Sequence, residues 1–147
     1  QNGQVILAGE AGTLLRSFDA GDHWERLDSP YQGSFFGVSG FTNAPDSVVA
    51  YGLRGNVYHS ADFGSSWSQL DSGTKASFYN ATPTHDGKVL LVGDAGSQLL
   101  TDGYTTELFL DPSRLPVLSV VETTERTFLS FGPAGVRDLT ITSEGRK

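Results

Sequence analysis

The sequence contains the stretch Ser17-Phe18-Asp19-Ala20-Gly21-Asp22-His23-Trp24, and its pattern returns 43 residues later as Ser60-Ala61-Asp62-Phe63-Gly64-Ser65-Ser66-Trp67. Both stretches read Ser-x-Asp-x-Gly-x-x-Trp. A carboxylate just after a strand can accept hydrogen bonds from backbone N–H groups that a tight turn leaves unpaired. The glycine supplies a positive φ, and the tryptophan offers a large apolar body to a neighbouring sheet. The pattern therefore predicts a turn between two strands.

A second pattern gives the length of the repeat. An apolar run followed by Gly-x-x-Gly occurs four times, and its first glycine stands at positions 9, 52, 93 and 132. The repeats are therefore 43, 41 and 39 residues long. Other short apolar or aromatic runs recur at fixed places around these glycines, with turn residues between them. No stretch has a sustained helical spacing of apolar residues.

Four short strands in every forty residues are typical of a β-propeller blade. We predict an all-β chain of propeller blades, each with four antiparallel strands. The runs group as three, four, four and three, which is about three and a half blades of a roughly seven-bladed propeller. The alternative is a β-sandwich whose hairpins resemble one another by accident. Under the propeller prediction, the chain is one partial propeller over residues 1–147, with repeats at approximately 1–29, 30–72, 73–112 and 113–147.

Three and a half blades cannot close a ring without exposing apolar sheet faces and unpaired strand edges. We therefore expect the chain to associate with a missing propeller half or with a second copy of itself. The chain starts at Gln1 and contains no methionine, which favours a fragment of a longer protein.

Composition excludes several functional classes. The formal net charge is −7, which argues against a sequence-independent grip on nucleic acid. There is no cysteine, so disulfides, thiolate metal sites and cysteine nucleophiles are excluded. The longest apolar runs, such as residues 89–92, are far shorter than the ~20 residues that span a bilayer. We therefore expect no direct membrane insertion.

The turn aspartates allow two interpretations. Asp19, Asp22 and Asp62 could bind calcium or act as catalytic acids, or they could cap their own turns. We favour capping, because the pattern supplies the donors that such a carboxylate needs. The predicted structural residues are Ser17, Asp19, Gly21, Trp24, Ser60, Asp62, Gly64 and Trp67. The histidines lack metal-ligand spacing, and we predict no catalytic residue, no metal site and no cofactor.

The segments 9–21 and 52–67 resemble the repeat of the photosystem II stability/assembly factor family, which belongs to the Asp-box (BNR-like) propellers. The resemblance covers the chain to about residue 100. In the third repeat the turn has decayed to Thr101-Asp102-Gly103. The resemblance implies a propeller of about seven blades with a chaperone-like or scaffolding role, without enzyme activity. It also implies a periplasmic or secreted location.

In a propeller, the turns between second and third strands share one face with the connections between blades. That face would carry Arg54 in a tight turn, with Tyr31, Lys75 and Arg114 on longer loops. A mixed-charge surface of this kind suits a protein partner, and an arginine there can fork onto a carboxylate or phosphate. The leading hypothesis is a non-catalytic, protein-binding scaffold or assembly factor for an envelope or membrane complex. The alternative is a fragment of an Asp-box sialidase or glycoside hydrolase whose catalytic residues lie outside this chain.

Overall fold

The computed structural model describes residues 3–124 and 127–141, and this part of the chain forms four antiparallel sheets. The first sheet contains β1 (Val5–Ala8), β2 (Leu14–Ser17) and β3 (Glu25–Arg26). The second contains β4 (Phe35–Phe41), β5 (Ala44–Gly52), β6 (Val57–Ser60) and β7 (Ser68–Leu70). The third contains β8 (Phe78–Pro83), β9 (Val89–Gly93), β10 (Ser97–Thr101) and β11 (Thr106–Leu110). The fourth contains β12 (Ser119–Thr124), β13 (Thr127–Gly132) and β14 (Gly135–Thr140).

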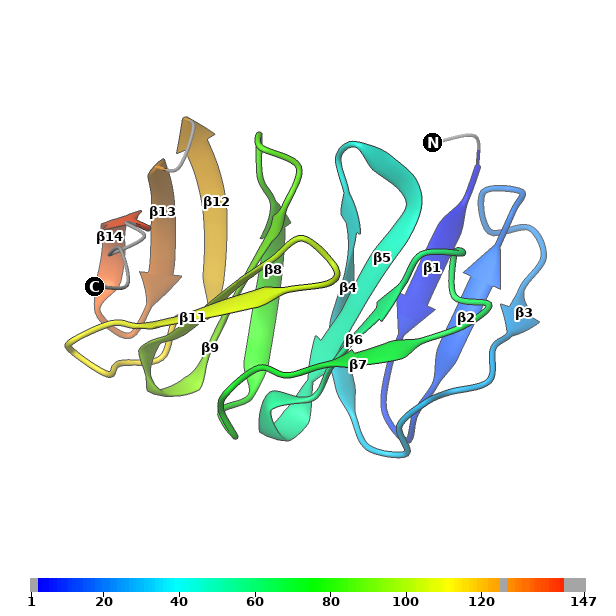
Figure 1. Ribbon diagram of the computed structural model, residues 1–147, viewed down its shortest axis with the longest axis horizontal. Coiled ribbons are helices and arrows are strands. Elements are labelled where there is room, and N and C mark those ends of the chain that lie inside the picture. Colours follow the sequence, from blue (N-terminus) through cyan, green and yellow to red (C-terminus); the bar gives the residue numbers. More distant parts are fainter. Residues whose placement is uncertain (1–2, 125–126, 142–147) are drawn as a thin grey trace.

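The sheets stand side by side in chain order (Figure 1), and within each sheet consecutive strands are hydrogen-bonded neighbours. Two single 3₁₀ turns, η1 (Leu53–Gly55) and η2 (Asp94–Gly96), interrupt the strands. The predicted all-β propeller architecture and its grouping of three, four, four and three strands are confirmed. Because the described strands form four sheets, two copies of this chain would bring eight sheets into a ring, rather than the seven expected from the strand count.

Three apolar clusters lie between successive sheets. The first joins the first two sheets and includes Leu14, Leu27, Phe35, Ala50 and Tyr58. The second joins the middle sheets and includes Phe41, Val49, Tyr51, Val57, Leu70, Phe78, Val89, Leu91 and Leu99. The third joins the last two sheets and includes Leu90, Val92, Leu100, Val117, Val120, Phe128, Leu139 and Ile141.

Strand β9 shows how one sequence run supplies two clusters. Successive side chains of a strand point to opposite faces of its sheet. Val89 and Leu91 therefore enter the second cluster, while Leu90 and Val92 enter the third. All four side chains are fully buried. A sheet buried on both faces needs a continuous apolar run rather than an alternating one.

The two Ser-x-Asp-x-Gly turns connect β2 to β3 and β6 to β7, and they share one hydrogen-bond pattern. In the second turn, the Ser60 hydroxyl donates to Asp62 (2.8 Å) and accepts from the Gly64 N–H (2.7 Å). Asp62 also accepts from the backbone N–H of Ser66 (2.8 Å) and from its hydroxyl (2.7 Å). The carboxylate and the serine hydroxyl thus pair the donors that the turn exposes, as the capping interpretation requires.

The first turn repeats these contacts. The Ser17 hydroxyl donates to Asp19 (2.7 Å) and accepts from the Gly21 N–H (2.9 Å). The His23 N–H donates to Asp19 at 2.9 Å. These donors, with the His23 N–H as the largest cause, lower the pKa of Asp19 to about 2. The Ser66 hydroxyl and N–H lower the pKa of Asp62 to about 2 in the same way.

The third turn keeps this chemistry although its sequence pattern is lost. Thr101 takes the place of the serine, and its hydroxyl accepts from the Gly103 N–H at 3.0 Å. Asp102 accepts from the N–H groups of Tyr104 (2.9 Å) and Thr105 (2.7 Å). The Thr105 N–H is the largest cause that lowers the pKa of Asp102. The shorter loop has therefore been closed by the same kind of carboxylate cap.

The two tryptophans differ in their surroundings. Trp67 packs against the first cluster, where it meets the sheet that precedes its own. Trp24 belongs to the first sheet and is 44% exposed. The expectation that both tryptophans are covered by a neighbouring sheet is therefore wrong for Trp24. The physical reason is that no described sheet precedes the first one.

The residue before each box serine reaches the turn of the following sheet. Arg16 of β2 donates to the Phe63 carbonyl (3.2 Å) and to the Ser65 hydroxyl (2.7 Å). His59, at the same position in β6, lies edge-on to the Tyr104 ring at a centroid distance of 5.1 Å. The turns thus join neighbouring sheets as well as neighbouring strands.

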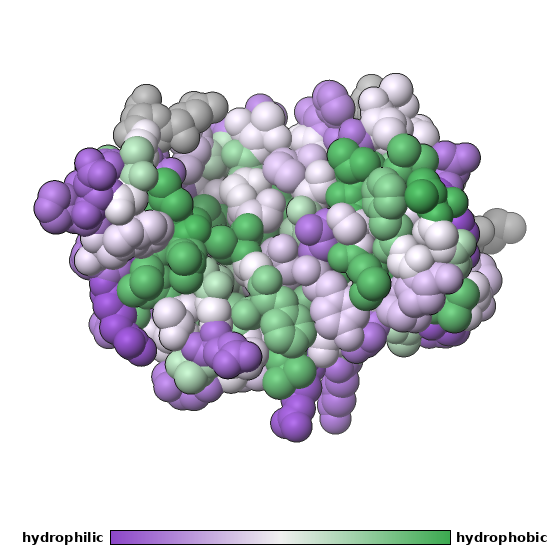
Figure 2. All heavy atoms as spheres, turned by 180° about the vertical axis from the view of Figure 1, so that it is seen from behind, coloured by the Kyte–Doolittle hydropathy of each residue, from purple (hydrophilic) through white to green (hydrophobic). Residues whose placement is uncertain are grey.

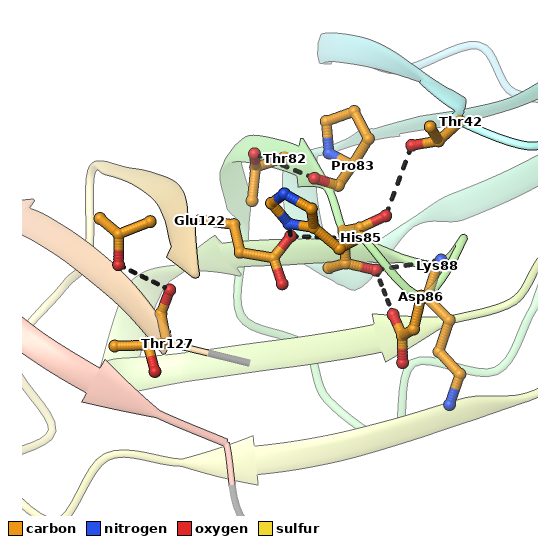
Figure 3. Close-up of polar contacts among 10 residues, drawn as sticks. Thr42, Thr82, Pro83, His85, Asp86, Lys88, Glu122 and Thr127 are labelled. Atoms are coloured by element: carbon orange, nitrogen blue, oxygen red, sulfur yellow. Dashed lines mark hydrogen bonds and ion pairs between the residues drawn. The ribbon is translucent and has the colours of Figure 1, made fainter. Parts of the chain in front are cut away.

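Polar contacts also connect the sheets along the same edge, where the β4–β5, β8–β9 and β12–β13 hairpins lie (Figure 1). Gln4 donates to Asp46 at 3.1 Å, and Thr42 donates to the Thr84 carbonyl at 3.4 Å. Figure 3 shows His85, between β8 and β9, against Glu122 of β12. The Glu122 carboxylate accepts from the His85 N–H at 2.6 Å and lies 2.6 Å from its Nδ1. Each pair of neighbouring sheets therefore has a polar link here in addition to its apolar cluster.

We expect Trp67→Ala to destabilise the protein by roughly 3 kcal/mol, because it removes a large aromatic group from an inter-sheet cluster. Trp24→Ala is the matched control at the same motif position, and we expect it to cost only about 1 kcal/mol because its ring is half exposed. Urea unfolding followed by circular dichroism measures both values. Equal losses for the two variants would contradict the packing described here.

The turn aspartates predict a loss of stability in acid. Their pKa of about 2 lies below the ordinary value of 3.8. The stabilisation is therefore complete above about pH 4 and disappears as the pH falls through 2. Thermal unfolding between pH 2 and pH 6 should show that Asp62→Asn flattens this dependence. Asp22→Asn is the control, because the Asp22 side chain takes no part in the turn hydrogen bonds, and an equal effect of both variants would refute the assignment.

Candidate functional site

The candidate site lies on the edge that carries the four Gly-x-x-Gly turns and the connections between sheets, which we call the turn edge. Its turns are residues 9–12, 52–55, 93–96 and 132–135, and its connections are residues 27–34, 71–77 and 111–118. In Figure 1 these segments lie along the lower side of the molecule. The third residue of the first three turns, which is Ala11, Arg54 or Ala95, has a positive φ between 50° and 58°. Arg54 therefore projects from a tight left-handed turn.

Hydrogen bonds from backbone and serine hydroxyl groups fix the Arg54 turn to the connections on either side. The Leu53 N–H donates to the Ser34 carbonyl at 3.1 Å. The Arg54 N–H donates to the Ser77 hydroxyl at 3.3 Å. The Ser72 hydroxyl donates to the Gly55 carbonyl at 2.8 Å. A Cβ on Gly55 would lie 2.1 Å from the Thr74 carbonyl oxygen, so only glycine allows the connection to approach this closely.

Arg54 is exposed, and no residue in the described part of the chain bonds its guanidinium group. It lines an open pocket of about 390 Å³ together with Gly55, Asn56, Gln69, Leu70, Asp71, Ser72 and Thr74. The lining is mostly polar, and Asp71 is already engaged by the Gly73 N–H at 2.9 Å. A free guanidinium on a fixed backbone beside amide and hydroxyl groups can bind a carboxylate in a bidentate manner.

The structure separates the four residues that the sequence singled out for partner binding. Lys75 is exposed and follows the pocket residue Thr74 on the same connection. Arg114 is exposed on the next connection, between β11 and β12, with a φ of 56°. Tyr31 is different, because its ring is partly buried in the first cluster, stacked at 6.1 Å from Tyr58. Arg54, Lys75 and Arg114 thus present cations on the turn edge, whereas Tyr31 contributes to packing between sheets.

Sequence reasoning missed a row of apolar side chains at the start of the inner strands. Phe36 and Tyr79 follow the buried first residues of β4 and β8, and Leu118 follows buried Val117 just before β12. The rings of Phe36 and Tyr79 are stacked at 5.9 Å, and Phe36 is 44% exposed and Leu118 51% exposed. A hydrogen bond to Asp94, together with burial, raises the pKa of Tyr79. The sequence does contain a signal for this row, the aromatic pairs Phe35-Phe36 and Phe78-Tyr79, but such pairs are equally typical of a buried core.

The described residues offer little that would support catalysis or metal binding. Residues 3–124 and 127–141 contain no group of three histidine or acidic side chains placed to hold a metal ion. The pKa values of Asp19, Asp62, Asp102 and Asp111 are all lowered. Such carboxyls stay ionised at neutral pH and cannot serve as general acids. In the same part of the chain, no helix is long and apolar enough to cross a membrane.

No family model and no curated protein matches the chain. Solved structures do match it over nearly its whole length. YCF48 bound to a D1 peptide is 17% identical, with a TM-score of 0.67 over 98% of this chain and 49% of that one. YCF48 from Cyanidioschyzon merolae is 13% identical, with a TM-score of 0.66 over 100% of this chain and 52% of that one.

An ancestral GH74 enzyme is 15% identical, with a TM-score of 0.74 over 94% of this chain and 21% of that one. The chain therefore spans about half the length of the YCF48 structures and about a fifth of the GH74 enzyme. At these identities the likeness shows the fold alone. The chain has a β-propeller fold and is similar both to a photosystem II assembly factor and to a propeller enzyme.

Proposed function

We propose that this chain is a non-catalytic, protein-binding propeller segment that acts as a scaffold or assembly factor for an envelope or membrane protein complex. Its partner is a polypeptide with an accessible carboxylate, which docks on the turn edge at Arg54. The proposal includes a periplasmic or secreted location, for which the family resemblance is the support.

One observation carries this proposal. Arg54 stands unpaired on a backbone held by its neighbours, beside an open polar pocket of about 390 Å³. The guanidinium fork is planar, so an arginine loses little conformational freedom per hydrogen bond when it binds a carboxylate. The likeness to YCF48, whose structure holds a D1 peptide, adds support because that protein of similar fold binds a peptide.

The alternative is part of a glycoside hydrolase, and the TM-score of 0.74 with the GH74 enzyme favours it. Glycosidases need one carboxyl with a raised pKa as general acid and a second carboxylate opposite it. The pKa values of Asp19, Asp62, Asp102 and Asp111 are all shifted downward. The carboxylates of Asp19, Asp62 and Asp102 already accept backbone hydrogen bonds from their own turns. These four carboxylates therefore suit turn capping and binding better than general-acid catalysis.

We expect Arg54→Glu to weaken peptide binding by roughly tenfold or more, because it replaces a charge-assisted hydrogen-bond donor by a repelling carboxylate. The probe is the D1 peptide, tested with a free and with an amidated C-terminus by isothermal titration calorimetry. The free carboxylate should bind more tightly, and the difference should vanish in the variant.

Arg26→Glu is the matched control. Arg26 is an exposed arginine of β3 that does not line the Arg54 pocket, and the substitution changes the net charge by the same amount. Equal effects of Arg54→Glu and Arg26→Glu would mean that binding depends on the net charge of the chain rather than on the Arg54 site. Unchanged binding by Arg54→Glu would refute the assignment of this edge as the binding surface.

A further inference from the structure

The apolar row described above begins beside Arg54. The Arg54 N–H donates to the Ser77 hydroxyl at 3.3 Å, and the N–H of the residue before it donates to the Ser34 carbonyl at 3.1 Å. Phe36 and Tyr79 each lie two residues after one of these serines. Two residues of a strand span about 7 Å, so both aromatic residues start close to the turn that carries the guanidinium group.

The row forms one continuous surface across three inner strands. The rings of Phe36 and Tyr79 are stacked at 5.9 Å across the gap between β4 and β8. The Tyr79 side chain hydrogen-bonds Asp94 in the next turn. Leu118 lies beside the same turn, because the N–H of the residue before it donates to the Gly93 carbonyl at 3.0 Å. Figure 2 views the molecule from the side of the inner strands, where apolar side chains reach the lower edge next to hydrophilic ones.

Three exposed cations flank the row, although the chain as a whole has a net charge of −7. Arg54 adjoins its first ring, and Lys75 and Arg114 each stand four residues before a member of the row. The neighbouring carboxylates of Asp71 and Asp111 already accept backbone N–H groups of their own loops, at 2.9 and 2.8 Å. This surface therefore favours a ligand that is anionic at one end and apolar next to it.

A polypeptide fits this surface better than a lipid or another small molecule. Small-molecule sites are concave and bury most of the ligand, whereas the row is open, with Phe36 44% exposed and Leu118 51% exposed. The pocket beside Arg54 contains none of the row's side chains, and its lining is mostly polar. Aromatic residues and arginine together are typical of surfaces that bind proteins.

We infer that the apolar row determines the specificity of the Arg54 site, and that it selects a partner polypeptide with apolar residues directly before its C-terminal carboxylate. This inference rests on the proposed function, in which Arg54 binds the carboxylate. Residues on one face of an extended chain are about 7 Å apart, which matches the spacing between the Arg54 turn and the rings. A leucine or aromatic side chain near the C-terminus therefore packs on Phe36 and Tyr79 while the carboxylate bonds Arg54. The partner's chain runs over the row and not over the polar pocket.

The experiment compares two synthetic peptides with free C-termini on the 147-residue chain. Both have a glycine–serine background and an N-terminal fluorescein, and one ends in Leu-Leu-Gly while the other ends in Ser-Ser-Gly. Fluorescence anisotropy should show at least about fivefold tighter binding of the leucine peptide, because its side chains leave water on the row. Phe36→Ser and Leu118→Ser should each reduce this preference and together abolish it, whereas Phe36→Leu should retain it.

Leu7→Ser is the matched control, because Leu7 of β1 is 43% exposed and lies outside the row, so this variant should keep the preference. Leu118→Ser should keep the thermal stability of the parent, since half of the side chain is already in water, and it decides the test if Phe36→Ser does not fold. The inference is overturned if the parent does not prefer the leucine peptide, which includes the absence of saturable binding. It is also overturned if the double variant keeps the preference, or if Gln69→Ala in the polar pocket removes it.

Arg54→Glu separates this inference from the proposed function. It should weaken the binding of both peptides. If it does so while the row variants leave the preference unchanged, this inference fails and the proposed function stands. Binding of both peptides as tight as in the parent would contradict the proposed function and this inference together.

Discussion

The whole structure depends on the burial of sheets that are apolar on both faces. A strand such as β9 has no polar side to turn toward water, because its four residues from Val89 to Val92 are all fully buried. Such a sheet is stable only with another sheet on each face. Successive sheets meet this need by standing side by side, and each of the three clusters fills the space between two of them. The turns add polar contacts at the edges of the same interfaces.

The same constraint explains where apolar surface remains. The outer faces of the first and last sheets expose Val5, Leu7 and Trp24 at one end and Val121, Phe131 and Val136 at the other. Figure 2 shows apolar side chains gathered toward these two ends of the molecule. In the inner sheets the equivalent positions are covered by a neighbouring sheet, so these faces have the character of inter-sheet surfaces rather than of ordinary solvated ones.

The repeat also places the functional candidates. The Gly-x-x-Gly turns are needed because backbone segments cross them closely, as the Thr74 carbonyl does at Gly55. This close crossing holds the turn edge rigid and leaves the variable residues of each turn free to face solvent. Arg54 occupies one of these variable positions, where alanine stands in the turns before and after it. A repeated scaffold can thus carry a site at one position without altering its packing.

Much of the fold was predictable from the sequence, because the regular repeat fixes the number and order of strands. The turn residues Asp19 and Asp62 were also predictable, since their pattern includes the donors that they pair. The sequence did not show that Asp102 caps a complete turn. The third loop is shorter and no longer matches the Ser-x-Asp-x-Gly-x-x-Trp pattern, although the same kind of cap still closes it. The half-exposed ring of Trp24 could not be predicted, because it follows from the absence of a preceding sheet among the described residues.

The side-by-side order of the sheets is tested most directly by methyl NOE spectroscopy on a sample labelled at valine and leucine. The structure predicts NOEs between sheets that are neighbours in the chain, such as those linking Val49 of β5 to the valine and leucine methyl groups of β9 in the second cluster. It predicts none between the first sheet and the third, for example between Leu14 and Leu90, which belong to different clusters. Strong NOEs between the first and third sheets would require face-to-face layers and would contradict the propeller arrangement.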